Sequence, residues 1–232
     1  MKTRDLLSIT LLCVTCSVRA QGNFQNLDFE ATNLPSTALP TDVPFTNALP
    51  AWTGYLGSNP AGQATYNGIS GAFAEISIID RNSTFYSNSV IAGNYTAAIS
   101  AGFSGTTFVP TSIAQTGLVP ATARSLVFDA QPFSGGINDL HVTFNGQDVP
   151  FFQTGAGTNF AIFAADIALL SGQTGELRFI ENPSSSTVAT TVLLDDIHFS
   201  VATIPEPGVL CLSTVGALLL ASRFRSSRHR KE

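Results

Sequence analysis

The segment Leu140–Phe152, which reads LHVTFNGQDVPFF, has the clearest local structure in the chain. Apolar and polar residues alternate over Leu140–Phe144, and this alternation is typical of a strand with one face in a core. The dipeptide Asn145-Gly146 follows, and it readily adopts the positive φ angles of a tight hairpin turn. The segment therefore predicts a β-hairpin whose second arm runs over Val149–Phe152.

Short β-rich segments continue on both sides of this hairpin and are separated by Gly, Pro, Asn and Ser, without any long stretch of helical period. This pattern predicts an all-β fold, an antiparallel β-sandwich of the jelly-roll type, as one domain over residues 21–203. We also expect a short helix over Asp166–Ser171 and long loops over residues 31–68. The expected strands are Phe24–Glu30, Ala72–Ile79, Tyr95–Ser100, Ser112–Leu118, Ser125–Ala130, Asp139–Phe144, Asp148–Gln153, Phe160–Ala164, Gly175–Glu181 and Thr191–Val201.

The charge distribution limits the partners of this domain. Charged residues make up 12% of the 232 residues, compared with about 25% in typical globular proteins. Residues 21–204 hold only three of the 11 Lys and Arg, namely Arg81, Arg124 and Arg178, but most of the 16 Asp and Glu. An acidic surface repels phosphate backbones, so we exclude nucleic acid as a partner. The three cysteines all lie in the terminal segments, so we expect a packed core to stabilise the domain without a disulfide.

The first 20 residues have the features of a secretory signal peptide. Lys2 and Arg4 form a basic start, Leu6–Val14 is apolar, and Val18-Arg19-Ala20 is a small-x-small cleavage site. We therefore expect the domain to be exported and to lie outside the cytoplasm.

Residues 204–232 form a second terminal segment with three parts. Pro205-Glu206-Pro207 is followed by the apolar run Val209–Ala221 and then by a basic cluster. We expect one transmembrane helix over residues 208–222, in which flanking residues help a short apolar run to span the bilayer. The basic tail, residues 223–232, would stay on the cytoplasmic side. Its basic residues are Arg223, Arg225, Arg228, Arg230 and Lys231.

These three parts resemble, in order and spacing, the PEP-CTERM sorting signal of Gram-negative bacteria. The resemblance implies recognition by an exosortase-type transpeptidase that cuts near the motif. It also implies association with exopolysaccharide at the cell surface or in the extracellular matrix. A plain membrane anchor that is never cleaved is the alternative.

The first and last predicted strands, with Asn26–Glu30 and Leu193–Phe199, resemble those of the galactose-binding-like jelly roll, a fold that includes many carbohydrate-binding modules. The resemblance implies a structural calcium ion held by the Asp28 carbonyl and by the carboxylates of Glu30 and Asp195. Independently, Asp195 shares strand parity with Leu193 and Ile197, so its carboxylate should point inward, where it needs a cation or several hydrogen bonds. Calcium and hydrogen bonding to the backbone both remain open, and we expect no other cofactor.

Aromatic residues in the loop-rich region are candidates for sugar binding. Trp52, Tyr55 and Tyr66 could form a platform for a glycan, although an aromatic residue of this kind can also plug the core beneath a loop. Within the domain only His141 and His198 could serve as catalytic histidines, and the G-x-S-x-G and H-E-x-x-H patterns are missing, so we expect no enzyme. The favoured function is a structural or adhesive protein of the cell envelope or matrix. The alternative is a glycan-binding module of the cell surface, and a polysaccharide hydrolase is a less favoured third.

Overall fold

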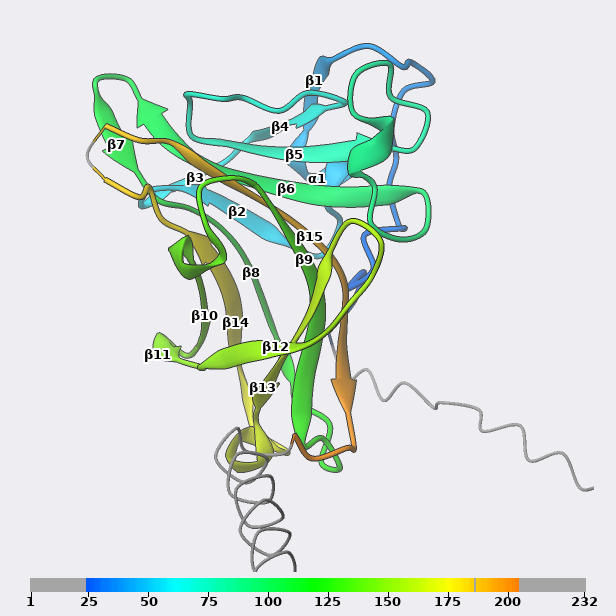
Figure 1. The fold of residues 1–232 in the computed structure, drawn as a ribbon, viewed down its shortest axis with the longest axis vertical. Coiled ribbons are helices and arrows are strands. Elements are labelled where there is room, and N and C mark those ends of the chain that lie inside the picture. The colour runs from blue at the N-terminus through cyan, green and yellow to red at the C-terminus, as the bar shows by residue number, and fades with distance from the viewer. Residues whose placement is uncertain (1–23, 186, 205–232) are drawn as a thin grey trace, which may run out of the picture.

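The computed structural model describes residues 24–185 and 187–204, which form two β-sheets packed against each other (Figure 1). The predicted all-β sandwich is confirmed. The predicted signal peptide, the Pro205-Glu206-Pro207 motif, the transmembrane helix and the basic tail lie outside the described residues. Within the described ranges, no helix is long and apolar enough to cross a membrane.

The larger sheet has nine strands, and its pairs are antiparallel except for the parallel pair β4–β5. A short strand, β7 (Thr107–Val109), pairs with β6 beside the main path of the sheet. The order along that path is β1 (Thr41–Pro44), β4 (Gln63–Tyr66), β5 (Glu75–Asp80), β6 (Tyr95–Ser104), β15 (Thr190–Ser200), β9 (Ser125–Ser134), β13 (Ala161–Asp166) and β12 (Phe151–Ala156).

The smaller sheet has six strands, all paired antiparallel. Its order is β11 (Gln147–Asp148), β10 (Leu140–Phe144), β14 (Thr174–Glu181), β8 (Thr111–Leu118), β2 (Thr53–Leu56) and β3 (Asn59–Pro60). In the part of the chain that the structure describes, the helical elements are single turns: α1 (Phe45–Ala48) and the 3-10 turns η1 (Ser87–Ser89), η2 (Ile137–Asp139) and η3 (Ala168–Leu170).

Side chains from the inner faces of both sheets form the core. Phe128 of the larger sheet makes an edge-to-face contact with Phe179 of the smaller one, with ring centroids 5.3 Å apart. Phe128 also packs against Phe151 and Phe163 at 5.2 and 5.6 Å. Aromatic contacts of this geometry add to the stabilisation from burial. On β14 the period of two is clear, because Leu177 and Phe179 are buried while Glu176, Arg178 and Ile180 are partly exposed.

The hairpin predicted from the sequence is confirmed in its first arm and turn. Asn145 and Gly146 have φ angles of 51° and 76°, and β10 pairs with β11 across this turn. The expected second arm, however, leaves the hairpin. After Val149 donates a hydrogen bond to the carbonyl of Val142, Pro150 has no N–H with which to continue the ladder. The chain then crosses to the larger sheet, where β12 pairs with β13.

Three other expectations are corrected by the structure. Phe24–Glu30 is not a strand, because positive φ angles at Asn26 (49°) and Phe29 (56°) turn the chain. Residues 31–68 are not simply loops, since they contain β1 to β4 and α1, which are too short to show a period. The helix expected over Asp166–Ser171 is reduced to the turn η3. The other predicted strands are confirmed, with their ends shifted by a few residues.

Candidate functional site

Arg178 lies flat across the outer face of the six-stranded sheet. It occupies the middle of β14, where it is paired with Thr143 of β10 on one side and with Ala114 of β8 on the other. Ala114 and Ser112, which lie two residues apart on β8, have small side chains and are buried. Arg178 therefore reaches over β8 to β2, and its guanidinium carbon lies 4.3 Å from the centroid of the Tyr55 ring.

Hydrogen bonds hold Arg178 in this position. Its Nε donates to Glu176 Oε1 at 2.8 Å, and its Nη1 donates to Ser112 Oγ at 3.2 Å. The bond to the Glu176 carboxylate raises the pKa of Arg178, while burial partly opposes this rise. Because the side chain remains 23% exposed, a charged and oriented guanidinium faces solvent. We call Tyr55, Ser112, Glu176 and Arg178 together the Arg178–Tyr55 face.

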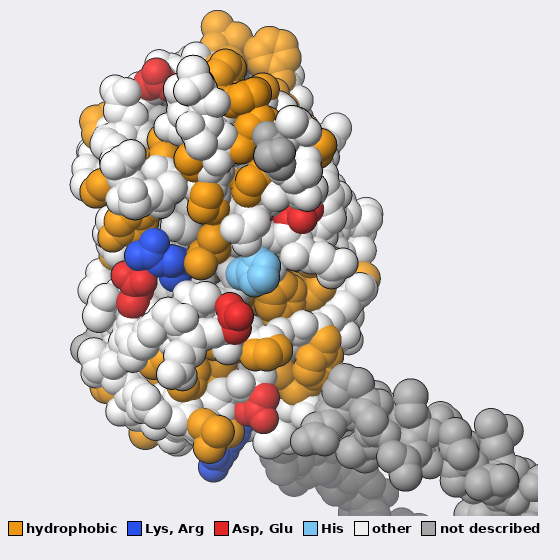
Figure 2. Space-filling view, turned by 90° about the vertical axis from the view of Figure 1, so that its left-hand side faces the viewer, with side chains coloured by type: hydrophobic (Ala, Val, Ile, Leu, Met, Phe, Trp, Pro, Cys, Tyr) orange, Lys and Arg blue, Asp and Glu red, His pale blue; other side chains and the backbone are white. Residues whose placement is uncertain are grey.

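A histidine and a carboxylate extend this surface toward the edge of the sandwich. His141 pairs with Ile180 on β14, so it lies diagonally across from Arg178. Its Nδ1 lies 4.0 Å from Asp148 Oδ1, and both side chains are well exposed. They line a hollow of about 500 Å³ where β10 and β12 diverge, together with apolar residues that include Phe151 and Phe152. Figure 2 shows this side of the molecule, with basic, acidic and histidine side chains gathered near the middle of a largely uncharged face.

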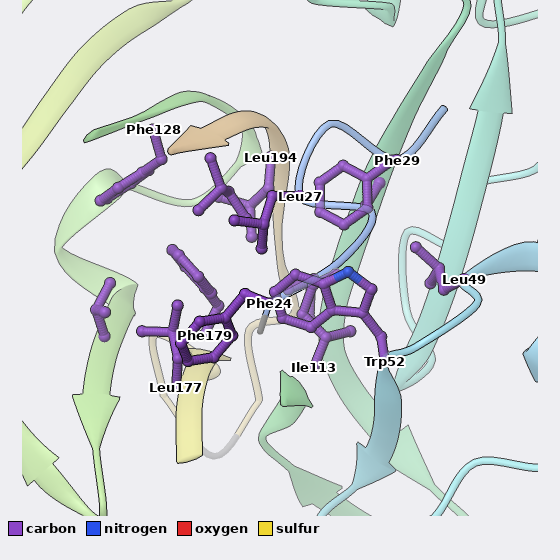
Figure 3. Close-up of a cluster of buried hydrophobic side chains, with 14 of the residues drawn as sticks. Phe24, Leu27, Phe29, Leu49, Trp52, Ile113, Phe128, Leu177, Phe179 and Leu194 are labelled. Carbon is purple, nitrogen blue, oxygen red and sulfur yellow. The ribbon is translucent and has the colours of Figure 1, made fainter. Parts of the chain in front are cut away.

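Of the three aromatic residues predicted to bind sugar, only Tyr55 lies on this surface. Trp52 is 4% exposed, and its ring centroid lies 5.7 Å from that of Phe29 and 6.4 Å from that of Phe179. Its Nε1 donates to the Asn26 carbonyl at 2.9 Å. Figure 3 shows Trp52 among these core side chains. The prediction that Trp52 forms an exposed platform is therefore wrong, because both faces of its ring are covered.

Tyr66 is also buried, with 2% of its surface exposed. Its hydroxyl donates to Asp80 Oδ2 at 2.6 Å, and burial together with this bond raises the pKa of Tyr66. Tyr66 ends β4 and faces the core. Its assignment to a glycan platform is wrong for the same reason as that of Trp52.

Ser112, Glu176 and Arg178 were not predicted from the sequence as binding residues. A signal for two of them was present, because Glu176 and Arg178 lie at the opposite strand parity to Leu177 and Phe179 and must therefore face outward together. The contact between Arg178 and Tyr55 had no local signal, since β2 and β14 are far apart in the sequence and meet only through β8.

The residues predicted to hold calcium were Asp28, Glu30 and Asp195, and the inward orientation of Asp195 is confirmed. Asp195 is 1% exposed, and its Oδ2 accepts hydrogen bonds from Thr96 Oγ1 at 2.6 Å and from the Ala92 N–H at 3.1 Å. Its Oδ1 accepts a bond from the Asp196 N–H at 2.8 Å. Burial raises the pKa of Asp195 to about 7, although these hydrogen bonds oppose the rise.

Glu30 and Asp195 both accept hydrogen bonds from one chain segment, residues 92–96. Glu30 Oε1 accepts hydrogen bonds from the N–H groups of Asn94 (2.6 Å) and Tyr95 (3.0 Å), and its Oε2 accepts one from Asn94 Nδ2. Asp28 has a different role, because its Oδ1 accepts the Glu30 N–H. The segment thus presents hydrogen-bond donors to both carboxylates, whereas calcium requires six to eight oxygen ligands. Within the described residues, no three His, Cys, Asp or Glu side chains gather as a metal centre, so any metal site there would have to be completed by hydroxyl, carbonyl or water oxygens. The donor set fits a hydrogen-bonded clamp and not a calcium site.

No family model and no curated protein sequence matches this chain. Among solved structures, the chain is similar to TmCBM61, solved with β-1,4-galactotriose, at 13% identity and a TM-score of 0.38, over 78% of this chain and 98% of the other. It is also similar to a family 11 carbohydrate-binding module from Clostridium thermocellum, solved with a β-1,3-1,4-linked tetrasaccharide, at 10% identity and a TM-score of 0.38, over 72% and 98%.

A third similar structure is the secreted serine protease VesC from Vibrio cholerae, at 19% identity and a TM-score of 0.33. The alignment covers 50% of this chain but only 23% of the protease. At these identities and TM-scores, the three similarities concern the β-rich architecture and extend no further.

Proposed function

We propose that the β-sandwich domain binds a glycan on the Arg178–Tyr55 face. The observation that carries this proposal is the guanidinium of Arg178, which lies against the Tyr55 ring and is fixed there by Glu176 and Ser112. A group that is already ordered loses little conformational entropy when a ligand binds, and this favours affinity. A mobile surface arginine would not have this advantage.

The chemistry of the face suits a sugar. A pyranose ring presents C–H groups on its faces and hydroxyls around its rim. The C–H groups can pack against the aromatic ring and the planar guanidinium, while the partly exposed Glu176 carboxylate offers oxygen atoms to the hydroxyls. Because Glu176 balances the charge of Arg178, the face does not select strongly for an anionic ligand. We therefore expect a neutral or weakly charged polysaccharide.

The cellular role in this proposal is that of an exported adhesive or structural protein without catalytic activity. Residues 1–20 would direct export, and residues 204–232 would engage the membrane and an exosortase-type transpeptidase. The domain would then be retained in the cell envelope, or released into the matrix, through its contact with polysaccharide. The terminal sequence motifs and the low surface charge of the domain support this role.

The proposal is tested with the full chain in mild detergent, by affinity electrophoresis in gels that contain soluble polysaccharides. We expect at least one polysaccharide to retard the wild type, and Arg178→Ala and Tyr55→Ala to weaken binding by about tenfold or more, which is about 1.4 kcal/mol. Arg124→Ala is the matched control, because Arg124 is an exposed arginine that precedes β9, outside this face. Unchanged retardation in both site variants would refute the assignment of this face.

A further inference from the structure

Glu181 is a buried carboxylate without a hydrogen-bond partner. It is the last residue of β14, where it pairs with Leu140 and Thr111. Its parity is that of Leu177 and Phe179, so its side chain points between the two sheets. The residue is 1% exposed, and neither Oε1 nor Oε2 has a hydrogen-bond partner. Leaving an ionised carboxylate in this state is strongly unfavourable.

A second carboxylate lies close to Glu181. Asp139 comes just before β10 and is partly exposed, and its Oδ2 accepts hydrogen bonds from the Gly136 N–H (3.0 Å) and the Ser184 hydroxyl (2.6 Å). Burial raises the pKa of Glu181 to about 8; the Thr190 hydroxyl opposes this rise and the charge of Asp139 adds to it. The Thr190 hydroxyl donates its own hydrogen to the Asn182 carbonyl at 2.7 Å, so it leaves Glu181 unsatisfied.

No arginine of the described residues compensates these two acids. Arg178 is bound to Glu176 on the outer face of the sheet. Arg81 and Arg124 lie at the other end of the larger sheet. Arg81 follows β5 at the end that pairs with Tyr95, the first residue of β6, and Arg124 precedes the first residue of β9. Thr190 instead lies near the last residues of β6 and β9. The acids therefore need their positive charge from elsewhere.

Protonation alone does not solve this problem. A proton on Glu181 would cancel its charge, but neither carboxyl oxygen accepts a hydrogen bond from a protein group, so the lone pairs would stay unsatisfied. A divalent cation would satisfy both the charge and the oxygen lone pairs. Ca²⁺ takes six to eight oxygen ligands in flexible geometry, so two carboxylates would need hydroxyl, carbonyl and water oxygens to complete a site.

We propose that Glu181 and Asp139 bind a calcium ion at the rim of the sandwich, with the Thr190 hydroxyl and water completing its ligands. The ion would link the end of β14 to the segment before β10 and to the start of β15. This site is distinct from the Glu30–Asp195 clamp, because Asp195 lies five residues along β15 from Thr190, about 16 Å away.

The proposal is tested by thermal unfolding of the full chain near neutral pH, with a chelator and with Ca²⁺ alone at about tenfold above its dissociation constant, together with calorimetric titration of Ca²⁺. We expect Ca²⁺ to raise the melting temperature of the wild type by about 3–6 °C. Glu181→Gln and Asp139→Asn should each abolish the shift and the titration signal. The matched control Glu30→Gln should keep both, since its remaining oxygen can still accept hydrogen bonds from the backbone.

Three results would overturn the proposal. Absence of any Ca²⁺ shift in the wild type would leave Glu181 as a protonated residue only. An undiminished shift in Glu181→Gln would place the ion elsewhere. Loss of the shift in Glu30→Gln, with retention in Glu181→Gln, would assign calcium to the Glu30–Asp195 clamp. If Glu181→Gln fails to fold, the Asp139→Asn variant gives the same decision, because Asp139 is partly exposed.

Discussion

Replacement of Trp52 by alanine should destabilise the domain strongly and should leave the glycan-binding residues in place. The indole packs between Phe29 and Phe179, and its Nε1 donates to the Asn26 carbonyl. Alanine would leave a cavity next to both rings, and the Asn26 carbonyl would keep only the long hydrogen bond from the Phe29 N–H at 3.4 Å. Large-to-small replacement of a buried tryptophan costs about 3–5 kcal/mol.

For a domain of this size, each kcal/mol lowers the melting temperature by about 2–4 °C, so Trp52→Ala should melt about 6–20 °C below the wild type. Trp52→Phe keeps most of the packing but loses the bond to Asn26, and it should cost about 1–3 kcal/mol. Tyr55→Ala, on the outer face, should have a much smaller effect on stability than either. Circular dichroism during heating measures all three.

Fluorescence gives an independent reading of the same residue, because Trp52 is the only tryptophan in the chain. The native protein should emit at short wavelength, be shielded from iodide quenching, and shift to longer wavelength on unfolding. Below its melting temperature, Trp52→Ala should still bind the polysaccharide that retards the wild type. A variant that melts like the wild type but no longer binds polysaccharide would refute the buried placement of Trp52 and restore it as a sugar platform.

Three further predictions follow from particular residues. Burial raises the pKa of Asp195 from 3.8 to about 7, so the contribution of Asp195 to the free energy of unfolding is complete below pH 4 and is lost as the pH rises toward 7. Denaturant unfolding across this range should show a smaller loss of stability in Asp195→Asn than in the wild type. An equal loss of stability in both proteins would contradict the prediction. Gly54→Ala should lower the free energy of unfolding by about 1–3 kcal/mol, because its new methyl group would overlap Phe45 and Ile76, whereas Gly62→Ala, in open space, should be neutral by the same assay. If the C-terminal segment is cut, an epitope in the turn at Gly105 should appear outside the cell without an epitope placed after Glu232, and co-fractionation of both epitopes in the membrane would indicate a permanent anchor.

The strands that the sequence predicted well are those long enough to show a period. On β14, Leu177 and Phe179 alternate with Glu176 and Arg178, and this pattern alone distinguishes the buried face from the exposed one. The segment Phe24–Glu30 is rich in apolar residues as well, but its backbone is satisfied by distant groups. For example, the Gln25 N–H donates to the Gln115 side chain and the Leu27 carbonyl accepts the Ile197 N–H. Such tertiary contacts leave no trace in a local pattern.

The candidate site was harder to predict than the fold for a similar reason. Composition placed Trp52, Tyr55 and Tyr66 together in a polar region, yet their exposure depends on where neighbouring strands lie. Tyr55 lies on the outer face of β2, the strand between β8 and β3 in the smaller sheet, while Trp52, three residues earlier, turns into the core. The partner of Tyr55 is Arg178, more than 120 residues later, and only the register of two strand pairs brings them together.

The two proposed sites share β14 but lie on opposite faces, and this separates their functions. Arg178 faces solvent at the middle of the strand, and Glu181 faces the core at its end. The contacts that order Arg178, to Tyr55, Glu176 and Ser112, are made by protein groups on the outer face. Calcium should therefore raise the melting temperature without changing glycan affinity at temperatures where the domain is folded. A glycan affinity that falls on chelation well below the melting temperature would contradict this separation and would mean that the ion orders the binding face itself.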